Sequence, residues 1–543
     1  MRESGSTPFF DGVSMKHLLS KLAASAALVA LAPAFPAHAA TPPGIFVIAT
    51  QLGEFTTLDP SEIYELVPSE YVANAYERLV RVDLRDPSKF EGRIAQSWSV
   101  GADGATYTFK LRPGLKFHSG NPVTADDVAW SLQRTVRLDK GPAGVLADLG
   151  LTKDNVARKV RKIDDMTVSI ETDRKYAPSF VLNVLSADPA SIVDKKLLLS
   201  HEKNGDFGNG WLKNADAGSG PYQLVKWTPN ESLVLQRFDG YRTPYPMKRI
   251  VLRHVPEASA QRLLLENGDV DAARNLSPDS LDALSKAGKI KVASWPVSAL
   301  LYLSLNTKNP NLAKPEVQEA MKWLVDYDGI QRNIVRTTYK VHQTFLPDGF
   351  LGALNANPYR QNVAKAKALL AKAGLPNGFA VSMDMPNDYP YVEIAQALQA
   401  NFAQGGITVK LIPGDAKQAI GKYRARQHDI FIGEWSPDYM DPNSNARGFA
   451  WNPDNSDNAK HKLLAWRNGW DVPQLTAQTD AALAEPSTAK RAQQYQALQK
   501  AVLANSPFVI MFEKVVQVAT RPGVTGPEIG PINDLVSYQT LKK

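Results

Sequence analysis

The residues of this chain best suited to chemistry follow the apolar run Ile430–Ile432. Two aromatic side chains, Trp435 and Tyr439, are interleaved there with two carboxylates, Asp438 and Asp441. Aromatic walls with a few well-placed polar groups are typical of a cleft that holds a small ligand. A surface loop anchored by an aromatic residue would show the same pattern, and the pattern alone does not separate the two.

Short motifs that mark common enzyme classes are missing from the sequence. It has no Gly-x-Ser-x-Gly nucleophile motif, no phosphate-binding P-loop and no His-Glu-x-x-His zinc motif. The eight histidines are scattered, and no two lie at a spacing that suits a shared metal ion. The acidic pairs Asp126-Asp127 and Asp164-Asp165 are expected to cap a helix or shape a turn, with Thr124 as a helix N-cap. We therefore expect no enzymatic activity, no cofactor and no metal ligands.

The amino-acid composition excludes several further kinds of functional site. The chain of 543 residues contains no cysteine, which rules out disulfides, thiolate metal sites, cysteine nucleophiles and an N-terminal lipid-anchored cysteine. The net charge is +7, but the basic excess is spread along the chain. A solvated basic surface is therefore favoured over a nucleic-acid-binding patch. A chain of this length with 44% hydrophobic residues is expected to form more than one domain.

The N-terminus has the order of regions of a secretory signal peptide. A pair of lysines flanks the start of Leu22–Phe35, which is dominated by Ala and Leu, and Ala37–Ala39 supplies a small-x-small cleavage site. The apolar run is interrupted by proline and is shorter than the about 20 residues that a spanning helix needs. We predict that residues 1–39 are cleaved and that the mature chain is exported to the periplasm. Translation starts at Met1 or at Met15.

The elements that position the 435–441 segment follow from apolar periodicity. Strands are predicted over residues 379–385, 407–411 and 429–435, with helices over 391–404 and 416–427 between them. Such a series builds a mainly parallel, doubly wound sheet. Ligands bind beyond the carboxyl ends of its strands, which is where the segment lies. Further elements are predicted as strands over residues 106–111, 167–172 and 508–512 and as helices over 317–325 and 490–504.

A series of short motifs runs through the chain in order. They are Ala95-Gln96-Ser97-Trp98, Asp103-Gly104, Tyr107-Thr108-Phe109, Leu111-Arg112, Gly114, Lys116-Phe117-His118-Ser119-Gly120, Thr124-Ala125-Asp126-Asp127-Val128, Gly218-Ser219-Gly220-Pro221-Tyr222 and Leu303-Ser304-Leu305-Asn306. The set resembles the signature of family 5 of the extracellular solute-binding proteins, the peptide- and nickel-binding proteins of ABC importers. The resemblance covers essentially the whole mature chain.

The resemblance implies an α/β fold of the two-lobed periplasmic-binding-protein type (type II, cluster C) with an extra small α/β domain. Its lobes are joined by crossover strands and close over the ligand. The implied lobe I is discontinuous and comprises residues 40–85, 218–296 and 506–543. The extra domain comprises residues 86–217, and lobe II comprises residues 297–505.

The resemblance also assigns the family's Trp-x-x-Asp motif to Trp435 and Asp438. In peptide-binding members this aspartate pairs with the α-ammonium of the ligand, whose charge compensates the desolvation of a buried carboxylate. Tyr439 is expected beside them, and Asp388 and Tyr389, in the loop after the preceding strand, complete the candidate ligand-binding set. Dipeptide-selective members carry an arginine in that loop. The loop has none here, so ligand length stays open.

The implied function is that of the periplasmic component of an ABC importer that captures a peptide. Its implied partners are an inner-membrane permease and its ATPase subunits. We expect a monomer that binds no nucleic acid. A non-peptide solute, such as a nickel chelate, haem, an opine or an oligosaccharide, stays open as an alternative, and a secreted hydrolase is less favoured. Asp438 favours a peptide, and the scattered histidines argue against bare nickel.

Overall fold

The computed structural model describes residues 41–53, 55–63, 65–84, 86–532 and 535–543. The predicted signal peptide and both candidate start methionines lie outside these residues. Within the described part of the chain, no helix combines the length and the apolarity that crossing a bilayer requires.

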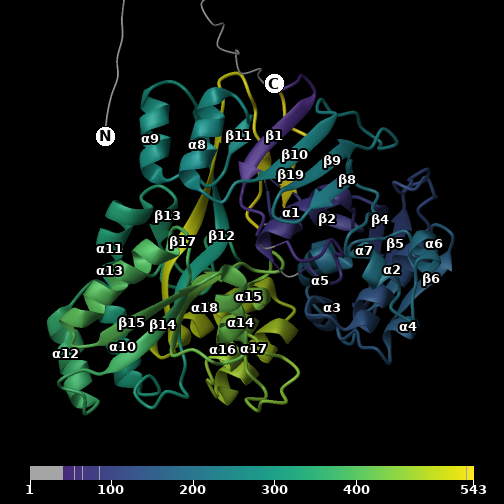
Figure 1. Cartoon of the computed structure of the whole chain (residues 1–543). Helices are drawn as coiled ribbons and strands as arrows, with labels where there is room; N and C mark the ends of the chain where they lie inside the picture. Colours follow the sequence, from purple (N-terminus) through teal and green to yellow (C-terminus); the bar gives the residue numbers. More distant parts are fainter. Residues whose placement is uncertain (1–40, 54, 64, 85, 533–534) are drawn as a thin grey trace, which may run out of the picture.

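A mixed sheet of eleven strands runs through both lobes (Figure 1), in the order β15-β14-β16-β12-β17-β11-β1-β10-β9-β8, with β13 paired to β17. Its strands are β1 (Ile45–Thr50), β8 (Tyr222–Thr228), β9 (Ser232–Arg237), β10 (Arg249–His254), β11 (Ala272–Ala273), β12 (Lys291–Leu305), β13 (Tyr339–Val341), β14 (Ala380–Pro386), β15 (Thr408–Gly414), β16 (Ile430–Trp435) and β17 (Phe508–Thr520). The lobes are therefore connected by continuous backbone pairing as well as by side-chain contacts.

The β-α-β-α-β series predicted for lobe II is confirmed. Strand β14 pairs in parallel with β15 and with β16, and the connecting helices are α13 (Tyr391–Gln404) and α14 (Ala416–Arg424). Beyond β16 the sheet becomes antiparallel, because β12 runs into lobe II and β17 runs back out of it. The sheet as a whole is therefore mixed.

The crossover strands β12 and β17 form the hinge region. Residues Lys291–Pro296 pair with Val515–Thr520 in the part of the sheet next to β11, and Leu300–Ser304 pair with Phe508–Glu513 in the part next to β16. The register shifts between Pro296 and Leu300, where the chain passes from one lobe to the other. The irregularity lies where a closing motion must be accommodated.

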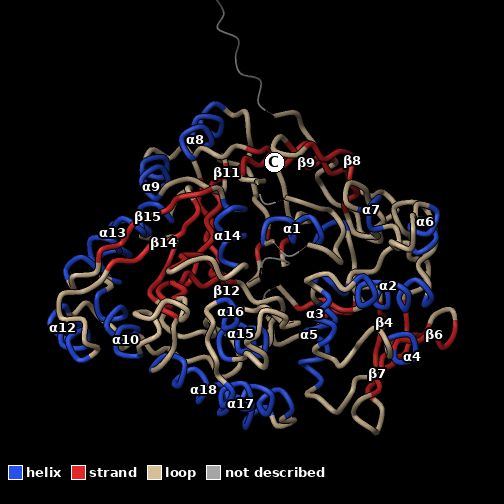
Figure 2. Tube along the Cα trace, turned by 60° about the horizontal axis from the view of Figure 1, so that its bottom comes forward, coloured by secondary structure: helices blue, strands red, loops and turns tan. Residues whose placement is uncertain are grey.

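Helices cover both faces of the sheet in lobe II, as Figure 2 shows. One core lies under α10 (Pro315–Leu324), α12 (Val363–Lys372) and α13, and the other under α14, α15 (Pro442–Ala450) and α18 (Thr488–Ala504). Other lobe II helices are α11 (Tyr327–Ile330), α16 (Leu464–Arg467) and α17 (Pro473–Ala484). Lobe I carries α1 (Leu66–Ala75), α8 (Ala258–Asn267), α9 (Pro278–Lys286) and the short strand pair β18 (Glu528–Ile529)/β19 (Val536–Ser537). The short pair β2 (Val80–Val82)/β3 (Phe90–Gly92) lies where the chain passes from lobe I to the predicted extra domain.

The extra domain is a small α/β unit with its own core. Its sheet has the order β4 (Ala95–Val100), β5 (Thr106–Leu111), β7 (Thr167–Glu171) and β6 (Val160–Asp164). Its helices are α2 (Ala125–Leu138), α3 (Ala143–Ala147), α4 (Val156–Lys159), α5 (Pro178–Ser186), α6 (Lys195–Ser200) and α7 (Asn209–Leu212). Thr124 is the N-cap of α2, as predicted, and forms a reciprocal capping box with Asp127.

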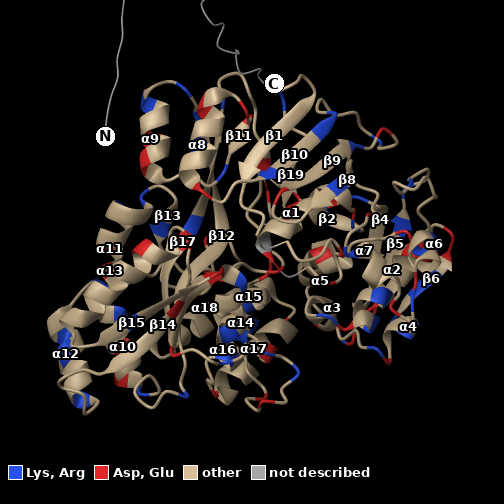
Figure 3. Ribbon diagram, in the orientation of Figure 1, with Lys and Arg blue, Asp and Glu red and all other residues tan. Residues whose placement is uncertain are grey.

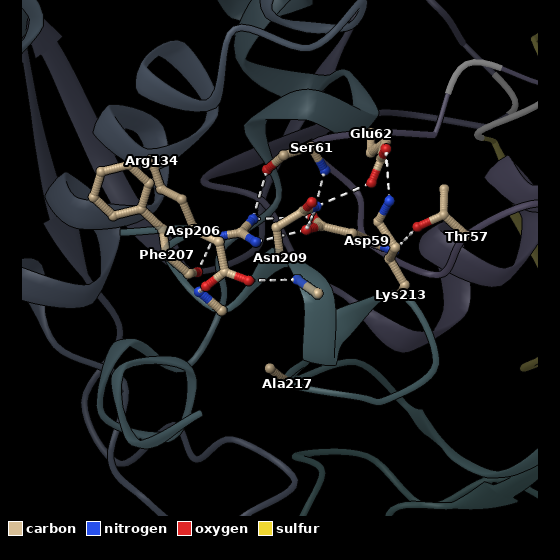
Figure 4. Close-up of polar contacts among 12 residues, drawn as sticks. Thr57, Asp59, Ser61, Glu62, Arg134, Asp206, Phe207, Asn209, Lys213 and Ala217 are labelled. Atoms are coloured by element: carbon tan, nitrogen blue, oxygen red, sulfur yellow. Dashed lines mark hydrogen bonds and ion pairs between the residues drawn. The ribbon is translucent and has the colours of Figure 1, made fainter. Parts of the chain in front are cut away.

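A buried ion pair fastens the extra domain to lobe I (Figure 4). The guanidinium of Arg134, on α2, donates two hydrogen bonds to the Asp59 carboxylate, at 2.9 and 2.5 Å, and neither side chain is exposed. Its Nε also donates to the Phe207 carbonyl at 2.9 Å, and Asn209 donates to Asp59 at 2.8 Å. With so many partners fixed in the interior, the seam between these two units is rigid.

Candidate functional site

Trp435 is the last residue of strand β16 and packs in the core of lobe II. The side chain is 7% exposed and packs in the core with Phe449, whose ring centroid lies 6.5 Å away. Its indole N–H donates to Asn445 Oδ1 at 3.0 Å. Both interactions fix the orientation of the indole, so Trp435 shapes the start of the 435–441 segment.

Asp438 lies where lobe II faces the extra domain. Its backbone N–H donates to Ser444 Oγ, on α15, at 2.8 Å, which holds the loop in place. No described residue donates a hydrogen bond to its carboxylate. Burial, followed by the nearby Asp188, raises the pKa of this carboxyl to about 7, and Arg467 has a smaller effect in the opposite direction. Asp188 belongs to the extra domain and is itself paired with Arg78.

Tyr439 links lobe II directly to the extra domain. Its hydroxyl donates to Asp148 Oδ2 at 2.6 Å, and its ring meets Phe180 edge-on at 6.0 Å. The side chain is 1% exposed and belongs to the core of the extra domain. Asp148 also pairs with Arg447 of α15. These contacts hold lobe II against the extra domain.

Asp441 caps the N-terminus of α15. Its side chain accepts from the Asn443 N–H at 3.0 Å at the N-terminus of α15. The same carboxylate accepts two hydrogen bonds from buried Arg491, at 3.0 and 2.8 Å. Since both oxygens are already engaged, Asp438 is the carboxylate of this segment that is available to a ligand.

Asp388 and Tyr389 lie near Glu434, on the face of the sheet opposite to Trp435. Burial raises the pKa of Asp388, and Glu434 adds to the effect. Successive residues of a strand point to opposite faces, so Glu434 and Trp435 diverge. Tyr389 donates its hydroxyl to the Ile334 carbonyl at 3.1 Å. Trp435, Asp438 and Tyr439 thus lie in one short segment, in which Trp435 packs in the lobe II core and Tyr439 in the core of the extra domain. The other two candidates lie beside the hinge.

The structure also shows groups that motif reasoning missed. Asp148 and Asp188 face lobe II from the extra domain, and no sequence signal marks them, because their role depends on how the lobes meet. Ligand atoms of His342, Asp348 and Glu513 lie within 4.8 Å of one another. Lys340 already pairs with Asp348 at 2.5 Å and with Glu513 at 3.3 Å, so an ammonium group contacts both carboxylates of this cluster.

Charged residues of both signs are mixed along the chain. Figure 3 shows lysine and arginine interspersed with aspartate and glutamate over the elements in view. A solvated basic surface without a nucleic-acid site stays a prediction.

Comparison with known proteins identifies similar chains. The family model described as bacterial extracellular solute-binding proteins, family 5 Middle, matches residues 89–457. The probable D,D-dipeptide-binding periplasmic protein DdpA of Escherichia coli K12 is 31% identical over 97% of this chain and 100% of its own length. The dipeptide-binding protein of the same organism is 25% identical over 84% of this chain and 87% of its own length.

Solved structures show the same fold. The Helicobacter pylori periplasmic protein DppA in complex with the peptide STSA has a TM-score of 0.80 at 22% identity, covering 91% of this chain and 98% of its own. The Agrobacterium protein MoaA in complex with mannopinic acid has a TM-score of 0.80 at 23% identity, covering 92% of this chain and 100% of its own. These neighbours hold different ligands on one architecture.

Proposed function

The chain belongs to family 5 of the bacterial extracellular solute-binding proteins, and from this premise we propose that it captures peptides between its lobes for an ABC importer. Both curated relatives described above are named for dipeptides and one of them for D,D-dipeptides. The ligand is expected between lobe II and the extra domain, at the carboxyl edge of β14 and β16, with Trp435 and Tyr439 beside it.

The observation that carries this proposal is the state of Asp438. Its carboxylate is partly buried, has no hydrogen-bond donor among the described residues and lies near a second carboxylate, Asp188. Ionisation there is unfavourable unless a cation enters. The α-ammonium of a peptide supplies that charge together with three donors. We expect Asp388 and Tyr389, near the hinge, to contact the distal part of a longer ligand.

Cellular location and partners form part of the proposal. The relative DdpA and the structural neighbour DppA are named as periplasmic proteins, and residues 1–39 have the pattern of a cleaved signal peptide. We expect a monomer that delivers its ligand to an inner-membrane permease driven by ATPase subunits. N-terminal sequencing of the periplasmic protein should begin at or near Ala40. An intact N-terminus retained in the membrane would contradict the proposed export.

Isothermal titration calorimetry with a peptide panel tests the ligand class. The panel contains L,L- and D,D-dipeptides and tripeptides, each with a free and an acetylated amino terminus. We expect saturable binding of free peptides and a loss of about 30-fold or more on acetylation. If acetylated and free peptides bind equally, the ammonium is not recognised. If no peptide binds, the proposed peptide ligand is wrong, and native mass spectrometry of the purified protein then identifies the solute that it carries.

A further inference from the structure

A second hollow lies outside the cleft, on the seam between lobe I and the extra domain. It encloses about 290 Å³, and its walls include Arg112 and Lys116 of the extra domain and Ser219, Phe238 and Arg242 of lobe I. None of the residues that line it comes from lobe II. Because the Arg134–Asp59 pair makes the seam rigid, the hollow does not depend on lobe closure.

Its walls carry uncompensated positive charge. The Arg112 guanidinium is fixed by backbone carbonyls, with Nε donating to Arg93 O at 3.0 Å and a terminal nitrogen donating to Gly92 O at 3.1 Å. Neither Arg112 nor Lys116 forms an ion pair with a carboxylate of a described residue. Glu77, the lining carboxylate, is already engaged by Arg242 at 2.6 and 2.9 Å.

The charge of Glu77 is satisfied within the wall. Burial alone would raise its pKa, but Arg93 and then Arg242 hold the pKa below its usual value. Arg93 lies 3.2 Å from the same carboxylate. Glu77 is therefore ionised, and the positive charges of Arg93 and Arg242 compensate it. The excess positive charge of the hollow belongs to Arg112 and Lys116.

Ser219 supplies an independent sign of a missing ligand. The residue is 3% exposed and lines the hollow, and its Oγ has no hydrogen-bond partner among the described residues. Its neighbours fix it in place, because a Cβ on Gly218 would lie 1.9 Å from Ala75 O and one on Gly220 would lie 2.5 Å from Asn74 O. A buried hydroxyl without a partner costs free energy.

We propose that this hollow is a second binding site, specific for a small oxyanion, either a carboxylate or a phosphate group. Arg112 and Lys116 provide the charge and Ser219 donates a hydrogen bond to an oxygen of the anion. Phe238 adds an apolar wall that suits an anion carried on a short organic chain. The site is separate from the peptide cleft, so its occupancy should not require peptide.

Calorimetry of the full mature chain at low ionic strength tests this site with two probes, inorganic phosphate and succinate. We expect one saturable site, and the tighter probe identifies the anion. Lys116→Gln, an exposed change, should weaken binding about tenfold, and Arg112→Gln combined with it should weaken binding further. Added salt should also weaken it. Lys367→Gln, an exposed change on α12 of lobe II, is the matched control.

The outcome is decisive in either direction. Peptide binding by the Lys116→Gln protein should stay at the wild-type level, which separates this site from the cleft. Ser219→Ala, which removes one buried hydroxyl, should lower anion affinity by a few-fold. The proposal is overturned if neither probe binds saturably to the wild type, or if Lys116→Gln and the double variant bind both probes as tightly as Lys367→Gln does.

Discussion

Peptide binding should release protons from Asp438. With its pKa raised to about 7 by burial and by Asp188, the carboxyl is about 90% protonated at pH 6 and about half protonated at pH 7. A bound ammonium stabilises the ionised form and lowers this pKa. Binding should therefore release about 0.9 proton at pH 6 and about 0.5 at pH 7. Affinity at pH 6 should be about tenfold below its plateau on the alkaline side.

Calorimetry in buffers of different ionisation enthalpy measures this number directly. At each pH, the slope of observed enthalpy against buffer ionisation enthalpy gives the protons exchanged. The α-amino group of the ligand has a pKa near 8, so titrations at pH 6 and 7 keep it charged. Asp438→Asn should abolish the release, whereas Asp454→Asn, an exposed change in lobe II, should leave it intact.

One result would refute this reasoning. If the wild type binds peptide at pH 6 without releasing protons, Asp438 is already ionised in the free protein. The ligand-free lobes would then open far enough to solvate the carboxyl, and its protonation in the closed arrangement would play no part in recognition.

Four further perturbations test other contacts. Asp438→Ala should cost roughly 2–5 kcal/mol in peptide affinity, and a double-mutant cycle with N-acetylation should be strongly non-additive; additive losses would mean that Asp438 does not hold the amino terminus. Tyr439→Phe removes the interlobe hydrogen bond and should weaken ligand-induced closure, seen by small-angle scattering as a smaller decrease in the radius of gyration; an unchanged decrease would assign closure to other contacts. Asp59→Ala leaves the buried guanidinium of Arg134 without its carboxylate and should lower the free energy of unfolding by about 3–5 kcal/mol. The control Glu62→Ala, at a more exposed carboxylate, should lower it by about 1 kcal/mol or less. Equal losses in denaturant titrations would contradict this. Burial raises the pKa of Glu513 to about 7 from 4.5, so between these pH values the folded protein holds a proton that the unfolded chain loses. The free energy of unfolding should therefore fall as the pH rises from 4.5 to 7, by at most about 3 kcal/mol. Glu513→Gln should reduce this pH dependence, and an unchanged dependence would exclude Glu513 as its source.

Local signals were sufficient to predict the lobe II core. Helix α13 lies over the residues predicted, and β14 and β16 lie within a residue or two of their predicted bounds, because apolar periodicity reports directly on which face is buried. The N-cap at Thr124 was predicted for a similar reason, since a capping box is encoded within four residues. Strand β17 was predicted only to Phe512 but extends to Thr520. Its second half is partly exposed in the hinge and lacks a continuous apolar run.

Contacts between distant segments could not be predicted in this way. Asp188 and Asp148 contribute to the candidate site only because the extra domain packs against lobe II, and nothing in the sequence around them indicates that. Tyr439 was predicted as a ligand contact from its motif, and in the structure its hydroxyl is bonded to Asp148. Its role toward the ligand stays a prediction. The residue boundaries given for the three domains are likewise predictions.

Closure of the lobes brings together both attractive and repulsive groups. The Tyr439–Asp148 hydrogen bond and the Arg447–Asp148 pair favour the closed arrangement. The approach of Asp438 to Asp188 opposes it, because Asp188 already pairs with Arg78, and Asp438 must then be ionised without a partner of its own or be protonated. A cationic ligand removes this cost without altering the other contacts. Ligand charge can therefore shift the balance toward closure through differential affinity for the closed state, which couples recognition of the amino terminus to the conformation that a permease would receive.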